Sequence, residues 1–402
     1  MLRDIIAKRE RELPVSTIGK LLEIAEEKKE YLSLGPGEPD FAAPKNVINV
    51  AIKKLKQGYT HYSPPEGIME LKQEIVKKLR MDNKIKAGQE NVIVTTGSTE
   101  GILLTLMATI DPGEGVLIPD PGFLAYKPVI EVLNGIPISV PLHEKDGFEY
   151  DTDRMKELII PEKTKSIILN SPANPTGTVL NKKNLEEIAD FAVEHNLLII
   201  SDEAYERFVY EDARHVSIGS LNGLENRVIT LFSFSKAYAM PGFRVGYAVG
   251  PESVISAMKK LHIFTTICAP TISQLAALEA LRGSGKYVKI MLKEYDKRRK
   301  YIVKRLNEID GINCRKPEGA FYTFPNITAF KMSSLKFSEW LLEKAKVVVV
   351  PGTEFGRHGE GYIRCSYATA LPKIKIALDR MEKALKTFNI GEREIPRSLE
   401  VG

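Results

Sequence analysis

A lysine flanked by hydroxyl groups and an arginine is the first candidate for covalent chemistry. The segment SFSKAYAMPGFRVG contains Ser233, Ser235, Lys236 and Arg244. A lysine amine can form a Schiff base with a carbonyl compound, while neighbouring hydroxyl and guanidinium groups can hold a phosphate. Taken alone, the segment fits a solvated lysine in a surface loop at least as well, so other residues must decide.

A carboxylate and a phenol stand close together in the segment SDEAY. Asp202 follows the apolar run LLIIS, and Tyr205 comes three residues later. A carboxylate at the end of a buried strand can meet a cationic ring nitrogen, and the tyrosine can donate to a ring hydroxyl. The alternative is a helix-capping aspartate followed by a core tyrosine.

Two turns add groups that suit a phenolate oxygen and a phosphate. In NSPANPTG the amide of Asn174 can donate to a phenolate, although turns of this composition are common. In VIVTTGSTEG, Ser98 and Thr99 begin a helix-period segment, where free backbone N–H groups suit a phosphate and an ordinary N-cap serine is the alternative. The segment matches neither GxxxxGK[ST] nor GxGxxG, which disfavours a nucleotide-binding loop.

An aromatic residue and a second arginine complete the candidates. Phe123, in PDPGF, can stack on a heteroaromatic ring, although most phenylalanines belong to the core. Arg364, in YIRCSYA, falls within an apolar run and therefore requires an anionic partner. A substrate carboxylate held by both guanidinium nitrogens meets that requirement, and so does an internal salt bridge.

The elements that must position these residues follow an α/β pattern between about residues 92 and 262. Most of the apolar runs are continuous rather than alternating, which is typical of a parallel sheet covered on both faces. Helix-period segments at 98–110 and 182–195 lie between them, and open sheets of this kind place their sites at the carboxyl ends of strands. The seven predicted strands are Val92–Thr96, Val116–Pro119, Ile136–Val140, Ser166–Asn170, Leu197–Ser201, Val228–Phe232 and Arg244–Val249.

From about residue 270 the pattern changes and predicts a smaller α+β domain. A helix at 18–28 and the loop LGPGEPDF are predicted before the first strand of the large sheet. In the second half of the chain we expect helices at 271–281, 286–309 and 371–388, and strands at 321–324, 347–350 and 362–366.

The composition excludes several classes of protein. With 402 residues, 43% apolar and 27% charged, the chain is neither disordered nor fibrous nor a coiled coil. The net charge of +5, without a dense basic block, gives no reason to expect a nucleic-acid partner. The three cysteines are too far apart for a CxxC metal site. We read no signal peptide and no apolar run of ~18 residues, and therefore expect a cytoplasmic protein without a membrane partner.

In their order and spacing, these motifs resemble those of the class I and II pyridoxal-phosphate aminotransferases of fold type I, in the aspartate aminotransferase superfamily. The resemblance runs from LGPGEPDF to YIRCSYAT and is greatest to prokaryotic and archaeal aspartate and aromatic aminotransferases. It implies an α/β fold with a three-layer large domain on a mostly parallel seven-stranded sheet, plus a smaller α+β domain. We expect an N-terminal arm with part of the small domain at 1–45, the large cofactor-binding domain at 46–284, and the remainder of the small domain at 285–402.

The resemblance implies pyridoxal 5′-phosphate as cofactor and gives three residues catalytic roles. Lys236 would form the internal aldimine and then move a proton between the substrate Cα and the cofactor C4′. Asp202 would keep the pyridine nitrogen protonated, and Tyr205 would hydrogen-bond the ring oxygen together with Asn174. Phe123 would stack on the ring, and the phosphate would be held by Ser98, Thr99, Ser233, Ser235 and Arg244, with Ser233 matching the spacing of the family's phosphate serine better than Ser235.

The resemblance also implies a substrate site and a partner. Arg364, Asn174 and the backbone of Gly37 would bind the α-carboxylate of the substrate. We expect a homodimer with shared active sites, in which Tyr62 of YTHYSPPEG reaches the phosphate of the neighbouring subunit. Asp120-Pro121 and Asn174-Pro175 match positions where relatives often have cis peptide bonds, and we expect at least one of them to be cis.

The implied reaction is ping-pong transfer of the α-amino group of an L-amino acid to 2-oxoglutarate. In LHIFTTICAP, where one subgroup of dicarboxylate-specific relatives has an arginine, this chain has His262 and Phe264. That difference favours broad or aromatic-leaning specificity over strict aspartate specificity, unless another cation, for example from the partner subunit, takes that part.

Two other classes of function stay open beside transamination. Another reaction on the same fold, such as a carbon–sulfur β-lyase or a γ-eliminating synthase, would use the same cofactor residues. A non-enzymatic derivative of the fold would be expected to have lost Lys236 or Asp202, and both are present.

Overall fold

A computed structural model of the chain describes residues 5–7, 11, 13, 19, 30–283 and 285–391, without the side chains of 389–391. The predicted helix at 18–28 therefore lies, apart from residue 19, outside the described residues. None of the described helices combines the length and the apolar content that crossing a bilayer requires.

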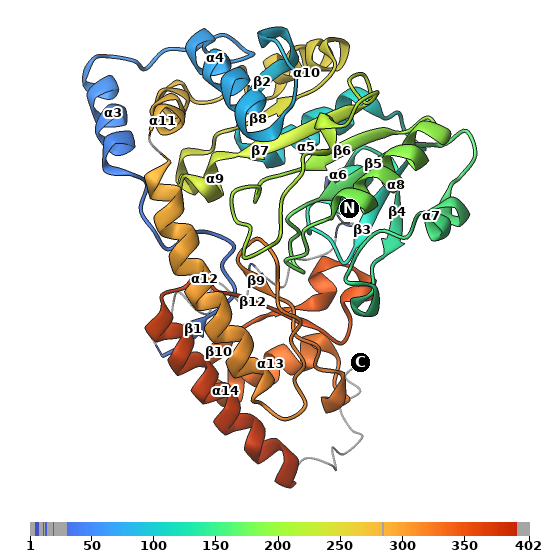
Figure 1. Cartoon of the computed structure of the whole chain (residues 1–402), viewed down its shortest axis with the longest axis vertical. Coiled ribbons are helices and arrows are strands. Elements are labelled where there is room, and N and C mark those ends of the chain that lie inside the picture. The colour runs from blue at the N-terminus through green and yellow to red at the C-terminus, as the bar shows by residue number, and fades with distance from the viewer. Residues whose placement is uncertain are drawn as a thin grey trace.

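A seven-stranded sheet in the order β2-β8-β7-β6-β5-β3-β4 forms the centre of the upper part of the molecule (Figure 1). Strand β8 runs antiparallel to both its neighbours, and the other pairs are parallel. The mostly parallel sheet and all seven of its predicted strands are thus confirmed. The strands are β2 (Val92–Thr95), β3 (Gly115–Asp120), β4 (Ile136–Pro141), β5 (Thr164–Asn170), β6 (Leu198–Asp202), β7 (Val228–Ser233) and β8 (Gly246–Val249).

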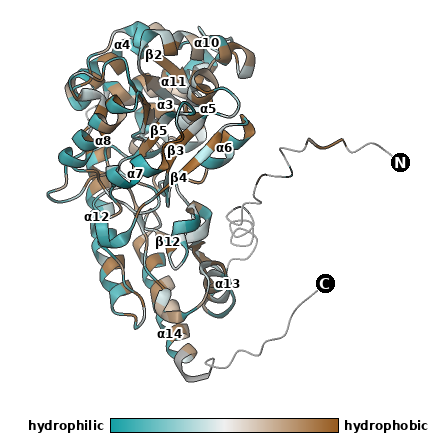
Figure 2. Cartoon of the chain, turned by 90° about the vertical axis from the view of Figure 1, so that its right-hand side faces the viewer, coloured by the Kyte–Doolittle hydropathy of each residue, from teal (hydrophilic) through white to brown (hydrophobic). Residues whose placement is uncertain are grey.

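Helices cover both faces of this sheet, which explains why most of its strand residues are apolar. On β5, Ile168 packs with one set of helices, whereas Ile167 and Leu169 pack with another. Figure 2 shows hydrophobic colour along the interior strands and hydrophilic colour on α7 and α8. The first face is covered by α5 (Gly97–Thr109), α6 (Tyr126–Val132) and α10 (Glu252–Thr265), and the other by α7 (Thr152–Leu158), α8 (Lys182–Glu194), α3 (Lys45–Lys56), α4 (Met69–Lys78) and α11 (Thr271–Arg282).

Within the described residues, two small sheets and three helices form the lower part of the molecule in Figure 1. One sheet pairs β1 (Leu32–Ser33) with β10 (Val347–Val348), and the other has the order β11-β12-β9, with β11 at Val350–Pro351, β12 at Ile363–Ser366 and β9 at Tyr322–Thr323. The helices are α12 (Lys286–Asn307), α13 (Ser334–Ala345) and α14 (Leu371–Gly391). The predicted domain boundaries at 45/46 and 284/285 stay predictions.

The single strand predicted at 347–350 is wrong, because the chain changes sheets within it. Val347 and Val348 pair with the N-terminal β1, whereas Val350 pairs with Arg364 on β12. All four valines are buried, so hydrophobicity alone gives no sign of the division.

The carboxyl ends of β3, β5, β6 and β7 meet at one edge of the sheet, because these strands are parallel. Near that edge the Asp120-Pro121 and Asn174-Pro175 peptide bonds are both cis, which confirms the expectation for them. Ser171-Pro172 is cis as well, although no pattern in the sequence indicated it. The short helix α9 (Phe234–Ala237) follows β7 directly and carries Lys236 at this edge.

Candidate active site

A cavity of about 240 Å³ lies at this edge of the sheet. Ten predicted site residues line it, together with Asn170 and Ala204, which were not among the predicted site residues. Tyr62 does not line the cavity and is 78% exposed in the single chain. The ten are Ser98, Thr99, Phe123, Asn174, Asp202, Tyr205, Ser233, Ser235, Lys236 and Arg244.

Lys236 projects from α9 into the cavity. Its ammonium nitrogen donates a hydrogen bond to the backbone oxygen of Gly37 at 2.5 Å. Burial, aided by the nearby charge of Arg364, lowers its pKa to about 8. A lysine with a lowered pKa has a larger neutral fraction near neutral pH, and the neutral amine is the nucleophile.

Asp202 ends β6 and is 4% exposed. Its carboxylate accepts hydrogen bonds from the Tyr126 hydroxyl at 2.8 Å and from the backbone N–H of Ala204 at 3.2 Å. Burial nevertheless raises its pKa above the ordinary aspartate value. Within the described residues no ion pair joins this carboxylate to a cation. A cationic ring nitrogen in the cavity would supply the missing counter-charge.

Asn170, the last residue of β5, links two of the predicted site segments. Its side-chain amide donates to the backbone oxygen of Asp202 at 2.9 Å and accepts from the backbone N–H of Asn174 at 2.8 Å. A polar residue that ends an apolar run was the signal that could have found it. Tyr126 had no such signal, because a tyrosine in a helix-period segment is indistinguishable from a core residue.

Groups that suit a phosphate gather on another side of the cavity. The side chain of Ser233 caps α9 by accepting from the backbone N–H of Ser235 at 3.1 Å. Ser98 and Thr99 stand in the first turn of α5, where unpaired N–H groups attract anions. Gly97 has a φ of 78°, and a Cβ there would lie 2.7 Å from an Arg244 guanidinium nitrogen. Glycine therefore lets this cation reach the start of the helix.

Arg364 is buried in β12 without a carboxylate partner among the described residues. Its guanidinium donates to Asn174 Oδ1 at 3.0 Å and to the backbone oxygen of Gly35 at 2.6 Å, and its Nε has no partner within the described chain. It also lies over the rings of Tyr322 and Phe355, 4.4 and 4.8 Å from their centroids. The internal salt bridge considered from the sequence is not formed, so the cation retains its capacity for an anion.

His262 and Phe264, on which the substrate preference was argued, lie away from the cavity lining. His262 is fully buried, with Nδ1 2.8 Å from the backbone oxygen of Pro65 and Nε2 3.3 Å from Glu100 Oε2. Phe264 is 88% exposed. Neither side chain reaches the cavity within one chain.

Comparisons with known proteins agree with this fold. The model of the family "Aminotransferase class I and II" matches residues 29–381. The aspartate aminotransferase of Pyrococcus abyssi is 48% identical over 374 residues, which cover 92% of this chain and 96% of the relative. The aromatic-amino-acid aminotransferase 2 of Thermococcus litoralis is 46% identical, again over 92% and 96% of the two chains.

A solved structure gives the same result in three dimensions. The crystal structure of an aromatic aminotransferase from Pyrococcus horikoshii superposes with a TM-score of 0.88 at 45% identity, covering 93% of this chain and 100% of that chain. The chain belongs to the class I and II aminotransferases. It is a transaminase of the branch that contains prokaryotic and archaeal aspartate and aromatic enzymes.

Proposed function

We propose that the enzyme binds pyridoxal 5′-phosphate in the cavity at the sheet edge and transfers the α-amino group of an L-amino acid to 2-oxoglutarate in a ping-pong reaction. The family is generally pyridoxal-phosphate-dependent. The observation that carries the proposal is the distribution of charge around one cavity. A lysine of lowered pKa, a buried carboxylate without a cation, and an arginine beside a helix start match the aldehyde, ring nitrogen and phosphate of this cofactor.

The residues around the cavity have separate tasks in this proposal. When bound, the cofactor supplies an aldehyde and a ring that delocalises the electron pair released at the substrate Cα. Lys236 would bind the aldehyde carbon with loss of water and, once displaced by the substrate amine, would move the proton between the substrate Cα and the cofactor C4′. Asp202 holds the proton on the ring nitrogen, while Tyr205 and Asn174 hydrogen-bond the ring oxygen.

Arg364 is proposed to bind the substrate α-carboxylate with help from the backbone of Gly37. Because Asn174 accepts from Arg364 at 3.0 Å, the substrate arginine and a cofactor ligand are in direct contact. Relatives named for aspartate and for aromatic amino acids support a range that includes both kinds of side chain. Within the described chain, no cation other than Lys236 and Arg244 lines the cavity, which supports broad rather than strict dicarboxylate specificity.

We also propose a cytoplasmic homodimer in which Tyr62 reaches the phosphate in the neighbouring subunit. The exposure of Tyr62 and Phe264, at 78% and 88% in the single chain, supports an additional covering surface, because burying large exposed apolar side chains favours association. Sedimentation velocity tests this proposal, and a Tyr62→Phe variant should weaken cofactor retention without altering the sedimentation coefficient.

One absorption experiment tests the reaction. The protein is reconstituted with pyridoxal phosphate, and its visible band is followed on adding excess L-glutamate and then 2-oxoglutarate. Loss of the band with glutamate and its return with 2-oxoglutarate are expected. Lys236→Ala should lack turnover and this cycle of band loss and return, even when it holds the cofactor without a covalent bond. A visible band that ignores glutamate, aspartate and phenylalanine but gives ammonia and a 2-oxo acid from a sulfur amino acid would favour the eliminating alternative. A wild-type protein that stays colourless overturns the cofactor assignment.

A further inference from the structure

Tyr322 lies between the part of the site that suits the cofactor and the part that suits the substrate. It belongs to β9 and is 1% exposed. Its hydroxyl oxygen is 2.7 Å from that of Tyr205, and the Arg364 guanidinium lies over its ring, 4.4 Å from the centroid. The roles derived above involve both of these neighbours but not Tyr322 itself.

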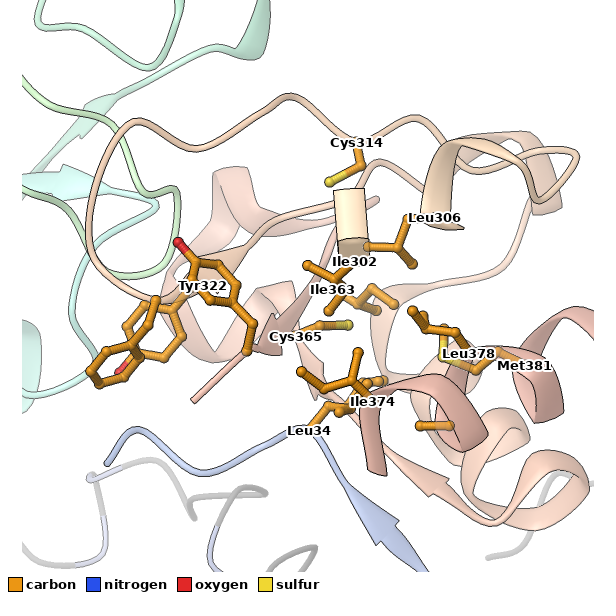
Figure 3. Close-up of a cluster of buried hydrophobic side chains, with 14 of the residues drawn as sticks. Leu34, Ile302, Leu306, Cys314, Tyr322, Ile363, Cys365, Ile374, Leu378 and Met381 are labelled. Carbon is orange, nitrogen blue, oxygen red and sulfur yellow. The ribbon is translucent and has the colours of Figure 1, made fainter. Parts of the chain in front are cut away.

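The hydroxyl of Tyr322 is held in place from several sides. In Figure 3 the ring stands at the edge of a hydrophobic cluster, and the hydroxyl points away from Ile363 and Cys365. A Cβ at Gly37 would lie 2.7 Å from this oxygen, so the loop that carries Gly37 closes over it. This packing restricts the position of the Tyr322 hydroxyl and keeps it within hydrogen-bond distance of the Tyr205 hydroxyl.

The donor count sets the direction of the hydrogen bond between the two phenols. Burial raises the pKa of both Tyr205 and Tyr322, so each keeps its proton at neutral pH. A phenol has one hydrogen to donate. If Tyr205 donates to the cofactor ring oxygen, it must accept from Tyr322, because its only hydrogen is already used.

We propose that Tyr322 is a positioning residue that donates to Tyr205, aims the Tyr205 hydroxyl at the cofactor ring oxygen, and with its ring fixes the plane of the Arg364 guanidinium. The proposal rests on the proposed pyridoxal-phosphate function. Tyr322 and Arg364 lie on the paired strands β9 and β12, whereas Tyr205 follows β6 of the large sheet. One side chain thus aligns the groups of the large sheet with those of the small sheet.

The test compares the holoenzymes of wild type, Tyr322→Phe and Tyr210→Phe. Tyr210 is the matched control, because it is a buried phenol of the same cluster that donates instead to the backbone oxygen of Ala320 at 2.6 Å. The substrate-free visible band is titrated with pH, and kcat and KM for the amino donor are measured.

In Tyr322→Phe, the Tyr205 hydroxyl should donate a weaker hydrogen bond to the ring oxygen of the cofactor. That oxygen then becomes more basic, so the proton shared between it and the nitrogen of Lys236 is held more tightly. We expect the titration midpoint of the band to rise by about half a pH unit, and kcat to fall by roughly three- to tenfold with little change in KM. Tyr322→Leu, which also removes the ring over Arg364, should in addition raise KM. Tyr210→Phe should keep the wild-type midpoint.

Two combinations separate positioning from a general packing defect. In a Tyr205→Phe background, Tyr322→Phe should cause no further shift of the midpoint, because the hydrogen bond that it directs is absent. Gly37→Ala, which displaces the Tyr322 hydroxyl, should raise the midpoint in the wild-type background but not in Tyr322→Phe, so the inference is testable even if one variant folds poorly.

The outcomes also distinguish this inference from the proposed function. A wild-type band that titrates and responds to glutamate, with Tyr322→Phe identical to wild type, overturns the role of Tyr322 alone. Equal midpoint shifts in Tyr322→Phe and Tyr210→Phe overturn it as well, since they indicate a packing effect. A wild-type protein that takes up no cofactor overturns the proposed function and this inference together.

Discussion

The segment 202–206, which begins with the last residue of β6, has two faces, and the buried carboxylates on the two faces differ in whether a cation compensates them. Asp202 and Tyr205 line the cavity, and burial raises the pKa of Asp202. Glu206, in the same segment, pairs with Lys78 and accepts from Asn83 at 2.6 Å. Although burial pushes the pKa of Glu206 upward, Lys78 and Asn83 hold it below the ordinary value.

The difference between Asp202 and Glu206 shows where this molecule keeps a buried charge without a cationic partner in the described part of the chain. A buried carboxylate is costly unless a cation and hydrogen bonds compensate it. On the face away from the cavity that compensation is internal, and Glu203 likewise accepts from Ser217 at 2.5 Å and contacts His215 at 2.8 Å. On the cavity face, no ion pair within the described residues joins Asp202 to a cation, which leaves room for a ligand to supply the counter-charge.

The largest expected effect comes from neutralising the cavity face. Asp202→Asn should reduce kcat/KM by about a hundred- to thousandfold, because a neutral amide does not hold a proton on the ring nitrogen. The thermal midpoint of the cofactor-free protein should not fall, since a buried, uncompensated charge is removed. Steady-state kinetics and calorimetry measure the two effects. An unchanged kcat/KM would show that another group carries the role.

Removing the charge of Glu206, on the other face, should lower the stability of the protein and leave its kcat nearly unchanged. Glu206→Gln leaves the Lys78 ammonium buried without its carboxylate and should destabilise the protein by about 3–5 kcal/mol in urea unfolding. The kcat of the folded fraction should stay within about twofold of wild type. As a control, Lys78→Met combined with Glu206→Leu should recover most of the stability. A large loss of kcat in folded Glu206→Gln would contradict the separation of the two faces.

Glu100 is another largely buried carboxylate, and its pKa should make the free energy of unfolding depend on pH. It accepts from Thr266 Oγ1 at 2.7 Å and lies 3.3 Å from His262 Nε2. Burial opposes ionisation, yet His262, Thr96 and Thr266 together lower its pKa to about 2 from an ordinary 4.5. Because the folded pKa is the lower one, the stabilisation is present above the unfolded value and is lost as pH falls through the folded value.

Wild type should therefore exceed Glu100→Gln in free energy of unfolding by about 3 kcal/mol at pH 7, and the difference should shrink as the pH falls from about 4.5 to about 2. Urea unfolding of both proteins at a series of pH values measures this. A difference that stays constant down to the acid end would refute the assignment of this pH dependence to Glu100.

The smallest effect is expected at an exposed pair. Lys182 Nζ lies 3.2 Å from Glu186 Oε1, and the two side chains are 67% and 52% exposed. Water already solvates both charges, so Lys182→Ala should change the free energy of unfolding by less than about 0.5 kcal/mol. A loss similar to that of Glu206→Gln would show that burial does not explain the contrast.

Most of this architecture could be predicted from the sequence alone. Short apolar runs, most of them continuous, predicted all seven strands of the large sheet, because strands buried on both faces tend to be apolar along their whole length. Ten predicted site residues line one cavity, because the carboxyl ends of parallel strands meet at one edge. No pattern in the sequence marked Tyr126 or Tyr322, whereas Asn170 ends an apolar run and could have been found from it.

What only the tertiary structure decided are contacts between distant residues. Arg364 and Gly35 are 329 positions apart, and Tyr205 and Tyr322 are 117 apart, so no local pattern relates them. The division of the valine run at 347–350 between two sheets has the same origin, since its partners are Leu32 and Arg364. Local sequence determines which residues are buried and which chemistry they carry. Whether a buried charge has a partner depends on which distant element packs against it. Lys78 of α4 packs against Glu206 and compensates its charge, whereas no cation among the described residues forms an ion pair with Asp202.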